Sequence, residues 1–232
     1  MVRTLPIRDI VAATPGARIV RLALGGEAFP YQPGQAVLVG SHGRDQRRPY
    51  SIASAPEDAQ REDCLELLVG VDADGLAGPH LALEPQARVD TDGPVGRFTF
   101  PDHPEEQRFV FIAGGTGIAP LRAMMRHALH GRHRQIGVLY SARRPGEFAY
   151  EAELRELARN GRIELKQTIT REIPESWTGP RGRIGRADLS PLVHDPATLC
   201  FVCGPPALVE EMPKLLEELG VPRTRIRIEA WG

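Results

Sequence analysis

In the first hundred residues, short apolar runs are separated by turns rich in glycine and proline. The turn signals include Thr14-Pro15-Gly16, Gly25-Gly26 and Gln32-Pro33-Gly34. Runs of this length between such turns are typical of β-strands, and their spacing favours an antiparallel Greek-key barrel. The pattern also predicts one short helix over residues 76–83. The expected strands cover residues 7–12, 18–24, 36–40, 49–53, 65–71 and 88–91.

The pattern changes after Phe100, where the polar, proline-bearing segment 101–107 is typical of a linker. Beyond it, apolar strand-like runs alternate with amphipathic helical segments, which favours a parallel sheet covered on both faces. We therefore expect two domains, a β-barrel over residues 1–101 and an α/β domain over residues 102–232. Its expected strands cover residues 109–113, 136–140, 163–170, 199–203 and 226–229, and its helices 121–130, 150–160 and 207–219.

The charge balance excludes a protein that binds nucleic acid through bulk positive charge. The chain has 29 basic and 30 acidic residues and a net charge of −1, whereas such proteins are strongly basic. No apolar run approaches the roughly 20 residues that a membrane-spanning helix needs. The N-terminal segment lacks the apolar stretch of a signal peptide. We expect no membrane span and a cytoplasmic location.

The cysteines and histidines predict no metal site. Three cysteines are too few for the four thiolates of a plant-type iron–sulfur cluster. Cys200 and Cys203 have the spacing of a redox or zinc pair, but they lie on a predicted strand, where residues three apart point to opposite faces. His127 and His130 share a helical face without a carboxylate at ligand spacing, which is typical of a solvated surface.

The segment Gly114 to Pro120, with the sequence GGTGIAP, lies between a predicted strand and a predicted helix. Its glycines allow a tight turn and a close approach of the backbone to a ligand. Pro120 is suited to the start of a helix, whose free N–H groups and dipole favour an anion such as a pyrophosphate. The residues alone leave two interpretations open, a simple turn or a phosphate-binding loop.

Three further segments lie at the ends of predicted strands. Arg48-Pro49-Tyr50-Ser51 places Arg48 and Tyr50 on one strand face and Ser51 on the other. Tyr140-Ser141-Ala142-Arg143 and Cys203-Gly204-Pro205-Pro206 follow strands at their carboxyl ends, where open α/β sheets bind ligands. Taken alone, Arg48-Pro49-Tyr50-Ser51 is equally compatible with a ligand site and with solvated or half-buried structural residues. A free cysteine is often a small buried apolar residue, but the Gly-Pro-Pro after Cys203 makes a purely structural role less favoured.

Together and in this order, the four segments resemble the ferredoxin–NADP reductase family of flavoproteins, and the resemblance covers nearly the whole chain. It implies an N-terminal barrel that holds FAD, with FMN as the alternative, and a C-terminal domain that binds NADPH or NADH. It also implies hydride transfer from the nicotinamide to flavin N5, followed by release of single electrons. The protein would supply position and electrostatics while the flavin carries the chemistry.

For the flavin, the resemblance assigns Arg48 to the pyrophosphate, Tyr50 to the isoalloxazine or ribityl chain, and Ser51 to the surroundings of N5. A second family motif, Gly-x-x-Ser/Thr opening a short helix, corresponds here to Gly75-Leu76-Ala77-Gly78, so the hydroxyl is absent. Trp231 corresponds to an aromatic residue on the far face of the flavin. The expected flavin-binding residues are Arg48, Pro49, Tyr50, Ser51, Val69, Gly75, Leu76, Ala77, Gly78 and Trp231.

For the nicotinamide nucleotide, the resemblance assigns the glycine loop and the ends of the following strands. Arg171 matches a residue that meets the 2′-phosphate of NADPH, although the 177–184 region is closer to relatives that use NADH. The expected nucleotide-binding residues are Gly115, Thr116, Gly117, Ser141, Arg143, Thr170, Arg171, Cys203, Gly204 and Pro205. Ser51, Cys203 and Glu229 are the expected catalytic residues.

The sequence therefore predicts a flavin-dependent NAD(P)H reductase. Its partner would be a redox protein, such as a ferredoxin, a flavodoxin or an oxygenase component, or a small-molecule acceptor. Two alternatives remain open at this point. One is a flavin reductase that releases free reduced flavin, and the other is a subunit that binds cofactors only within a larger electron-transfer complex.

Overall fold

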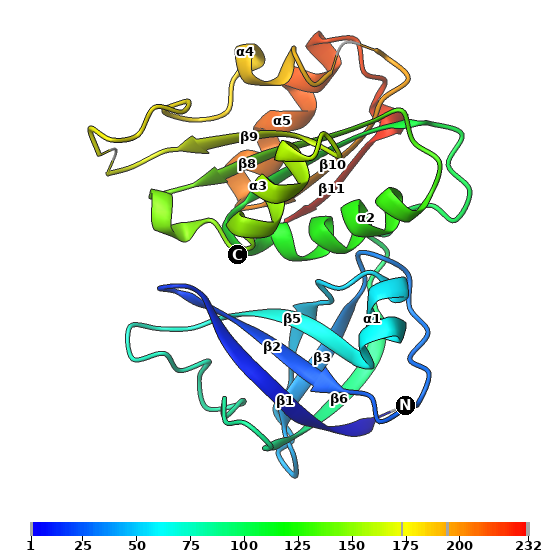
Figure 1. Ribbon diagram of the computed structural model, residues 1–232, viewed down its shortest axis with the longest axis vertical. Helices are drawn as coiled ribbons and strands as arrows, with labels where there is room; N and C mark the ends of the chain where they lie inside the picture. The colour runs from blue at the N-terminus through cyan, green and yellow to red at the C-terminus, as the bar shows by residue number, and fades with distance from the viewer. Residues whose placement is uncertain (1, 173, 194, 231–232) are drawn as a thin grey trace. The chain divides into compact units, whose positions relative to one another are not determined.

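A computed structural model describes residues 2–172, 174–193 and 195–230, which form two compact units (Figure 1). The first unit runs to Phe100 and includes Arg122–His127, which belong to a later helix. The second unit comprises Pro101–Leu121 and the chain from Ala128 onwards. Each unit is described by itself below.

The first unit is a six-stranded antiparallel sheet with the strand order β4-β3-β6-β1-β2-β5. The two edges of the sheet meet, because Ile52 bridges Leu67 and the Ala53 amide donates to the Glu66 carbonyl at 2.7 Å. The predicted antiparallel barrel is thereby confirmed. The elements are β1 Arg3–Thr14, β2 Ala17–Ala23, β3 Ala36–Ser41, β4 Arg48–Ser51, α1 Pro56–Glu62, β5 Cys64–Gly70 and β6 Arg88–Val95.

The barrel is filled by the alternating apolar positions that the sequence pattern indicates. Ile7, Leu22 and Leu65 are fully buried, and Leu67 is almost so. Side chains two apart on a strand point to the same face, so each strand contributes a row to one core. The core holds the strand ends that carry the predicted flavin residues in a fixed register.

The prediction of a helix over residues 76–83 is wrong, because this segment is irregular, with one turn at residues 79–80. Gly75 and Gly78 have positive φ angles of 79° and 103°, and Pro79 follows, so a regular helix is excluded. The short helix of the first unit is instead α1. Pro56 begins α1, and two acidic residues lie in its first turn, where the helix dipole favours them.

Two buried carboxylates join the barrel to the part of helix α2 (Ile118–His130) that belongs to the same unit. Arg122 donates to Glu66 at 2.8 Å and to the Ala53 carbonyl at 2.7 Å. Arg126 pairs with Asp58, which also accepts from Arg61 at 2.7 Å. Both carboxylates are nearly inaccessible to solvent. These ion pairs are therefore buried contacts that hold the helix against the barrel, and not solvent-exposed surface pairs.

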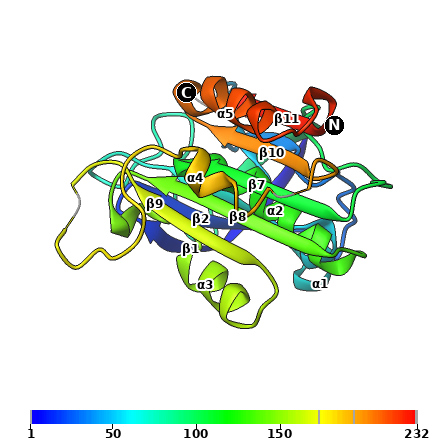
Figure 2. The ribbon, with the colours of Figure 1, turned by 90° about the horizontal axis from the view of Figure 1, so that it is seen from above.

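The second unit is a five-stranded parallel sheet with the strand order β11-β10-β7-β8-β9. Helices α4 and α5 lie over one face of this sheet and α3 over the other (Figures 1 and 2). This confirms the predicted α/β architecture. The strands are β7 Arg108–Gly114, β8 Gln135–Ala142, β9 Glu164–Ile169, β10 Leu199–Gly204 and β11 Ile226–Ala230. The helices are α2 Ile118–His130, α3 Glu151–Arg159, α4 Arg186–Leu189 and α5 Pro206–Glu218, with 3-10 turns at Gly115–Gly117, Pro145–Glu147 and Arg223–Arg225.

The strand order reverses direction next to β7. From β7 the chain adds β8 and then β9 on one side, and it returns to add β10 and β11 on the other. The carboxyl ends of β7 and β10 therefore flank a topological switch point, the place where open α/β sheets bind ligands. Both glycine-containing turns predicted from the sequence follow these two strands.

Candidate nucleotide-binding sites

The first candidate site lies on the barrel at strand β4. Arg48 and Pro49 are exposed, Tyr50 is half-buried and Ser51 is buried, with 6% of its surface accessible. Antiparallel pairing with β3 places Tyr50 opposite Val37 and Ser51 opposite Ala36. The guanidinium of Arg48 is exposed and available to a ligand, whereas little of Ser51 is accessible.

Tyr50 is paired with a histidine that the sequence did not single out. The Tyr50 hydroxyl lies 2.7 Å from Nε2 of His80, and the two rings are within 13° of parallel. Burial raises the pKa of Tyr50, against the opposing effect of Arg48. Burial also lowers the pKa of His80, and the charge of Arg48 lowers it further. At neutral pH the pair is therefore a protonated tyrosine and a neutral imidazole beside a guanidinium.

The motif Gly75-Leu76-Ala77-Gly78 forms a turn that is closed by Asp72. The Asp72 carboxylate accepts from the Asp74 and Leu76 amides at 3.0 and 2.9 Å. The amides of Ala77 and Gly78 donate to no described residue. A β-carbon built on Gly75 would lie 3.2 Å from Nη2 of Arg18, so a second guanidinium stands beside this turn. The arrangement offers N–H donors and positive charge without the helix that we expected.

Two predicted flavin residues are placed differently from those on β4. Val69 has no accessible surface and packs within the barrel core, so its side chain is not presented to a ligand. Leu76 is 62% exposed. Trp231 lies outside the described residues. The structure therefore brings together Arg48, Tyr50 and the unpredicted His80, but not every residue of the expected set.

The second candidate site lies at the switch point, where two turns are in backbone contact. A β-carbon added to Gly117 would lie 2.3 Å from the Cys203 carbonyl oxygen, and one added to Gly114 would lie 2.7 Å from Cδ of Pro205. Only glycine permits so close an approach. The start of α2 follows one turn and the start of α5 follows the other. The N-termini of two helices therefore lie side by side, and helix N-termini favour anions.

A buried tyrosine fixes the first of these turns. The Tyr140 hydroxyl donates to the Gly115 carbonyl at 2.9 Å and accepts from the Ala149 amide at 3.2 Å. Burial raises its pKa, so it remains protonated. Sequence reasoning treated Tyr140 only as part of a strand-end motif. The sequence signal for this role was a tyrosine within an otherwise aliphatic strand, because a buried tyrosine hydroxyl needs a hydrogen-bond partner.

The ends of β8 and β9 place the remaining predicted nucleotide residues next to one another. The Arg171 amide donates to the Arg143 carbonyl at 2.9 Å, and the Thr170 amide to the Ala142 carbonyl at 3.0 Å. The side chains of Arg143 and Arg171 are exposed, and Ser141 is half-buried. Arg144 is instead paired with Glu172. Two guanidiniums therefore remain at this strand edge for a phosphate-bearing ligand.

Cys203 and Glu229 are neighbours across β10 and β11 in parallel register. Cys203 has no accessible surface; burial raises its pKa, and the Glu229 carboxylate raises it further. Both effects favour the thiol form of Cys203 over the thiolate. Cys200 belongs to the core cluster below α5, and burial raises its pKa to about 12.

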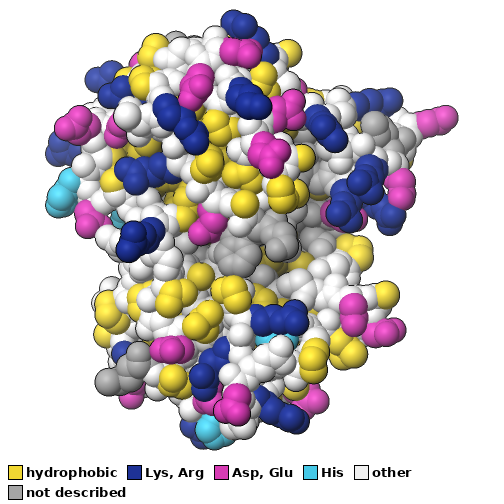
Figure 3. All heavy atoms as spheres, turned by 180° about the vertical axis from the view of Figure 1, so that it is seen from behind, with side chains coloured by type: hydrophobic (Ala, Val, Ile, Leu, Met, Phe, Trp, Pro, Cys, Tyr) yellow, Lys and Arg dark blue, Asp and Glu magenta, His cyan; other side chains and the backbone are white. Residues whose placement is uncertain are grey.

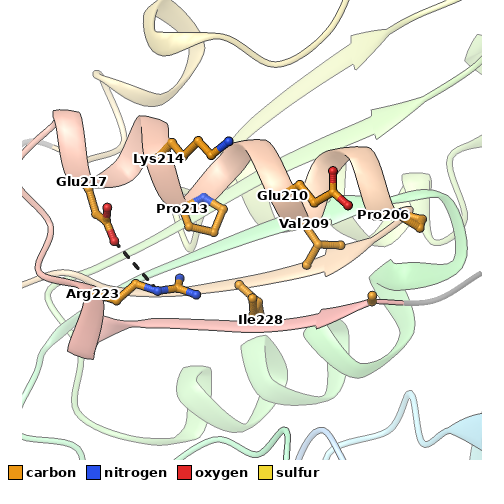
Figure 4. Close-up of a pocket in the computed structure, with 9 residues that line it drawn as sticks. Pro206, Val209, Glu210, Pro213, Lys214, Glu217, Arg223 and Ile228 are labelled. Atoms are coloured by element: carbon orange, nitrogen blue, oxygen red, sulfur yellow. Dashed lines mark ion pairs between the residues drawn. The ribbon is translucent and has the colours of Figure 1, made fainter.

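A groove of about 620 Å³ runs between α5 and β11 and contains none of the predicted site residues (Figure 4). Val209, Pro213 and Ile228 form its apolar floor, and Glu217 pairs with Arg223 at 3.9 Å along its rim. Acidic and basic side chains are also interspersed over the face shown in Figure 3. The described residues contain no cluster of three metal-ligating side chains and no helix able to span a membrane.

The chain is similar to known NAD-binding oxidoreductases. The family model of an oxidoreductase NAD-binding domain matches residues 111–214. The chain is 36% identical over 220 residues to ferredoxin–NADP reductase B of Sorangium cellulosum, covering 89% of this chain and 87% of the relative.

The chain also resembles solved structures of reductases. The chain resembles the cytochrome P450 reductase GcoB of Amycolatopsis with a TM-score of 0.82 and 28% identity, over 99% of this chain and 70% of the other. It also resembles a ferredoxin NADP+ reductase of Neisseria gonorrhoeae, solved with bound FAD and NADP. There the TM-score is 0.80 over 99% and 98% of the two chains, and at 20% identity this likeness shows the fold alone.

Proposed function

Because the chain belongs to the ferredoxin–NADP reductase family of oxidoreductases, we propose that it is a flavin-dependent NAD(P)H reductase. The observation that carries the proposal is the switch point, where the GGTG and CGPP turns meet backbone to backbone. This geometry fits a dinucleotide held at two helix N-termini. The barrel, with its exposed Arg48, provides the matching flavin site.

The barrel residues fit FAD on three observations. Arg48 offers a guanidinium to a pyrophosphate. Among the described residues, the Ala77 and Gly78 amides and one buried nitrogen of His80 have no hydrogen-bond partner. When bound, FAD would accept a hydride at N5 and return the electrons one at a time. Tyr50 would then orient the ring, and the Ser51 hydroxyl would hydrogen-bond near N5. Ser51 is held by its strand pairing, so it would need no reorganisation.

In the second unit, Gly115, Thr116, Gly117, Gly204 and Pro205 would hold the nucleotide at the two turns. Ser141, Arg143 and Thr170 would contact its phosphates from the neighbouring strand ends. Arg171 is exposed, and within the described part of the chain it is engaged only through its backbone amide, which supports NADPH over NADH. The neutral Cys203 thiol would limit the position of the nicotinamide ring, and Glu229 would hold a negative charge close to it.

We propose that the electrons pass to a ferredoxin, a flavodoxin or an oxygenase-type component. This choice rests on the names of the relatives, which include a ferredoxin–NADP reductase and a cytochrome P450 reductase. A flavin reductase that releases free reduced flavin is a second candidate. It is favoured by one observation, the lack of a hydroxyl and of a helix at Gly78.

The test is to purify the chain alone and measure NAD(P)H oxidation with ferricyanide. A yellow protein that turns over without added flavin supports the reductase. Turnover only with added flavin supports the second candidate, and no turnover with either contradicts both. Reduction assays with ferredoxins, flavodoxins and oxygenase components then identify the acceptor.

A further inference from the structure

His80 carries a buried nitrogen that the fold does not satisfy. Only 1% of the residue is accessible, and Nε2 is engaged by the Tyr50 hydroxyl at 2.7 Å. Nδ1 is buried and has no hydrogen-bond partner among the described residues. Buried polar atoms are nearly always partnered, so an orphan nitrogen indicates a missing ligand or a bound water.

Nδ1 borders the position that a side chain at Gly78 would occupy. A β-carbon built on Gly78 would lie 3.5 Å from Nδ1 and 3.7 Å from Cε1 of His80. Gly78 has a φ of 103°, a conformation that favours glycine over serine or threonine. The backbone of this chain therefore excludes the motif's side chain, and the imidazole borders the space that this side chain would have filled.

Donors and a cation border this space, and the Asp72 carboxylate at the same turn is engaged by the Asp74 and Leu76 amides. The Ala77 and Gly78 amides donate to no described residue, and the charge of Arg48 acts on both His80 and Tyr50. Because Tyr50 is protonated, its hydroxyl can donate to Nε2, and the single proton of a neutral imidazole then lies on Nδ1. Such a cluster matches a phosphate oxygen, which only accepts hydrogen bonds.

We propose that His80 donates a hydrogen bond from Nδ1 to a phosphate oxygen of the bound flavin nucleotide, in place of the hydroxyl absent at Gly78. This inference rests on the proposed function, since it requires that the barrel bind FAD. The competing explanation is that His80 serves only to hold the Tyr50 ring through Nε2.

Two substitutions separate these roles, because each places an amide nitrogen near the position of one of the two imidazole nitrogens. In His80→Asn the amide nitrogen is attached at Cγ, as Nδ1 is, whereas His80→Gln carries its amide one carbon further, near Nε2. Dissociation constants of the flavin-free full chain are measured by fluorescence for FAD and for riboflavin, which has no phosphate. His103→Gln, at an exposed histidine, is the matched control.

If Nδ1 binds phosphate, His80→Gln weakens FAD binding about 10- to 100-fold, as expected for a hydrogen bond to a charged group. Riboflavin binding by this variant stays at the wild-type value, and His80→Asn retains most of the FAD affinity. Equal losses of affinity for FAD and riboflavin in His80→Gln, or a larger loss of FAD affinity in His80→Asn than in His80→Gln, would overturn the proposal. Either result would mean that His80 serves only to hold the Tyr50 ring. Wild-type protein that binds no FAD would instead overturn the proposed function.

A measurement on the wild type covers the case in which a variant does not fold. Nitrogen-15 NMR of the histidine side chains reports the hydrogen bond at Nδ1 directly. FAD should shift the Nδ1 resonance of His80, and riboflavin should not. An Nδ1 resonance that is the same with both flavins would contradict a phosphate contact.

Discussion

Single side chains in both candidate sites have their charge and protonation fixed by their surroundings. Arg48 is exposed and charged, and it stands beside a neutral His80 and a protonated Tyr50. In the other unit, Cys203 is kept as a thiol by burial and by Glu229. These residues can therefore bind, orient and exclude water, while redox chemistry is left to the cofactors.

Arg48→Ala should weaken FAD binding. The variant loses a charge-assisted contact to the pyrophosphate, worth roughly 1.5–3 kcal/mol, or about 10- to 100-fold in the dissociation constant. Flavin content after purification and titration of the flavin-free protein measure the effect. Arg44→Ala, at an exposed arginine on the preceding turn, should bind FAD normally. Unchanged affinity in Arg48→Ala would remove this assignment.

Arg171→Ala should raise the Michaelis constant for NADPH about tenfold or more and leave that for NADH nearly unchanged. The reason is loss of a guanidinium that would meet the 2′-phosphate, which NADH lacks. Steady-state kinetics with both coenzymes give the comparison, and Arg132→Ala serves as an exposed control. Equal effects on both coenzymes, or a wild type that prefers NADH, would contradict the role of Arg171.

At the scale of elements, the important contacts join segments that are distant in the sequence. The turn after β7 packs against the turn after β10, and the middle of α2 is fixed to α1 and β5 by arginine–carboxylate pairs. Neither arrangement follows from local propensity. Each depends on a close approach or on a buried charge that has a partner from another element.

Gly117→Ala should destabilise the second unit and weaken nucleotide binding. Its methyl group would lie 2.3 Å from the Cys203 carbonyl oxygen, so one turn must shift. Overpacking of this kind costs about 1–3 kcal/mol. Chemical denaturation and titration with NADP+ measure the two effects. Gly146→Ala is the matched control, because a β-carbon there meets open space. Wild-type stability and affinity in Gly117→Ala would contradict the backbone contact.

Asp58→Asn should destabilise the first unit in a pH-dependent way. Burial alone would raise the pKa of Asp58, but hydrogen bonds and charge from Arg126 and Arg61 lower it from 3.8 to about 2. The stabilisation from a lowered carboxyl pKa is present above the unfolded-state value and is lost as pH falls through the folded-state value. The variant should therefore lose about 3 kcal/mol at pH 7.

Urea denaturation between pH 7 and pH 2 checks this prediction. The difference between wild type and Asp58→Asn should shrink as the pH falls from about 5 to about 2, because the wild-type carboxylate becomes protonated over that interval. Asp45→Asn, at an exposed position, should show no such change. A difference that stays constant with pH would mean that the charge of Asp58 contributes nothing.

For the whole molecule, the two proposed cofactor sites correspond to the two types of sheet. The closed antiparallel barrel presents strand ends held by one core, where we propose the flavin site, and the open parallel sheet presents a switch point, where we propose the nucleotide site. The net charge of −1 gives no net field for steering a partner. We therefore expect the acceptor to be selected by local contacts rather than by long-range attraction.

FAD should raise the melting temperature of the intact chain. A ligand that binds only the folded state at 100 times its dissociation constant adds about 2.7 kcal/mol of stability. For a chain of this size, that corresponds to a rise of about 5–10 °C. Differential scanning fluorimetry with and without FAD measures it, and Arg48→Ala should show a smaller rise at the same concentration. No shift in the wild type would argue against FAD as the barrel ligand.

The sequence by itself determined the two sheet types and the positions of the turns. Glycine, proline and alternating apolar residues act over a few neighbours, so strands such as β3 and β7 and the turn at Gly114–Pro120 could be predicted locally. The same local signals gave a wrong prediction where the backbone conformation of two glycines determined the structure. The residues predicted as a helix over 76–83 are irregular, because Gly75 and Gly78 adopt positive φ angles.

Only the tertiary structure decided which residues meet. His80 and Arg18 come from different parts of the chain, and the closing of the barrel brings them beside Tyr50 and Gly75. Tyr140 supports Gly115, and Gly117 contacts Cys203, because parallel strands align their carboxyl ends. Contacts between distant residues leave no periodic trace in the sequence, so the turns could be predicted from it, whereas the partners that give them their chemistry could not.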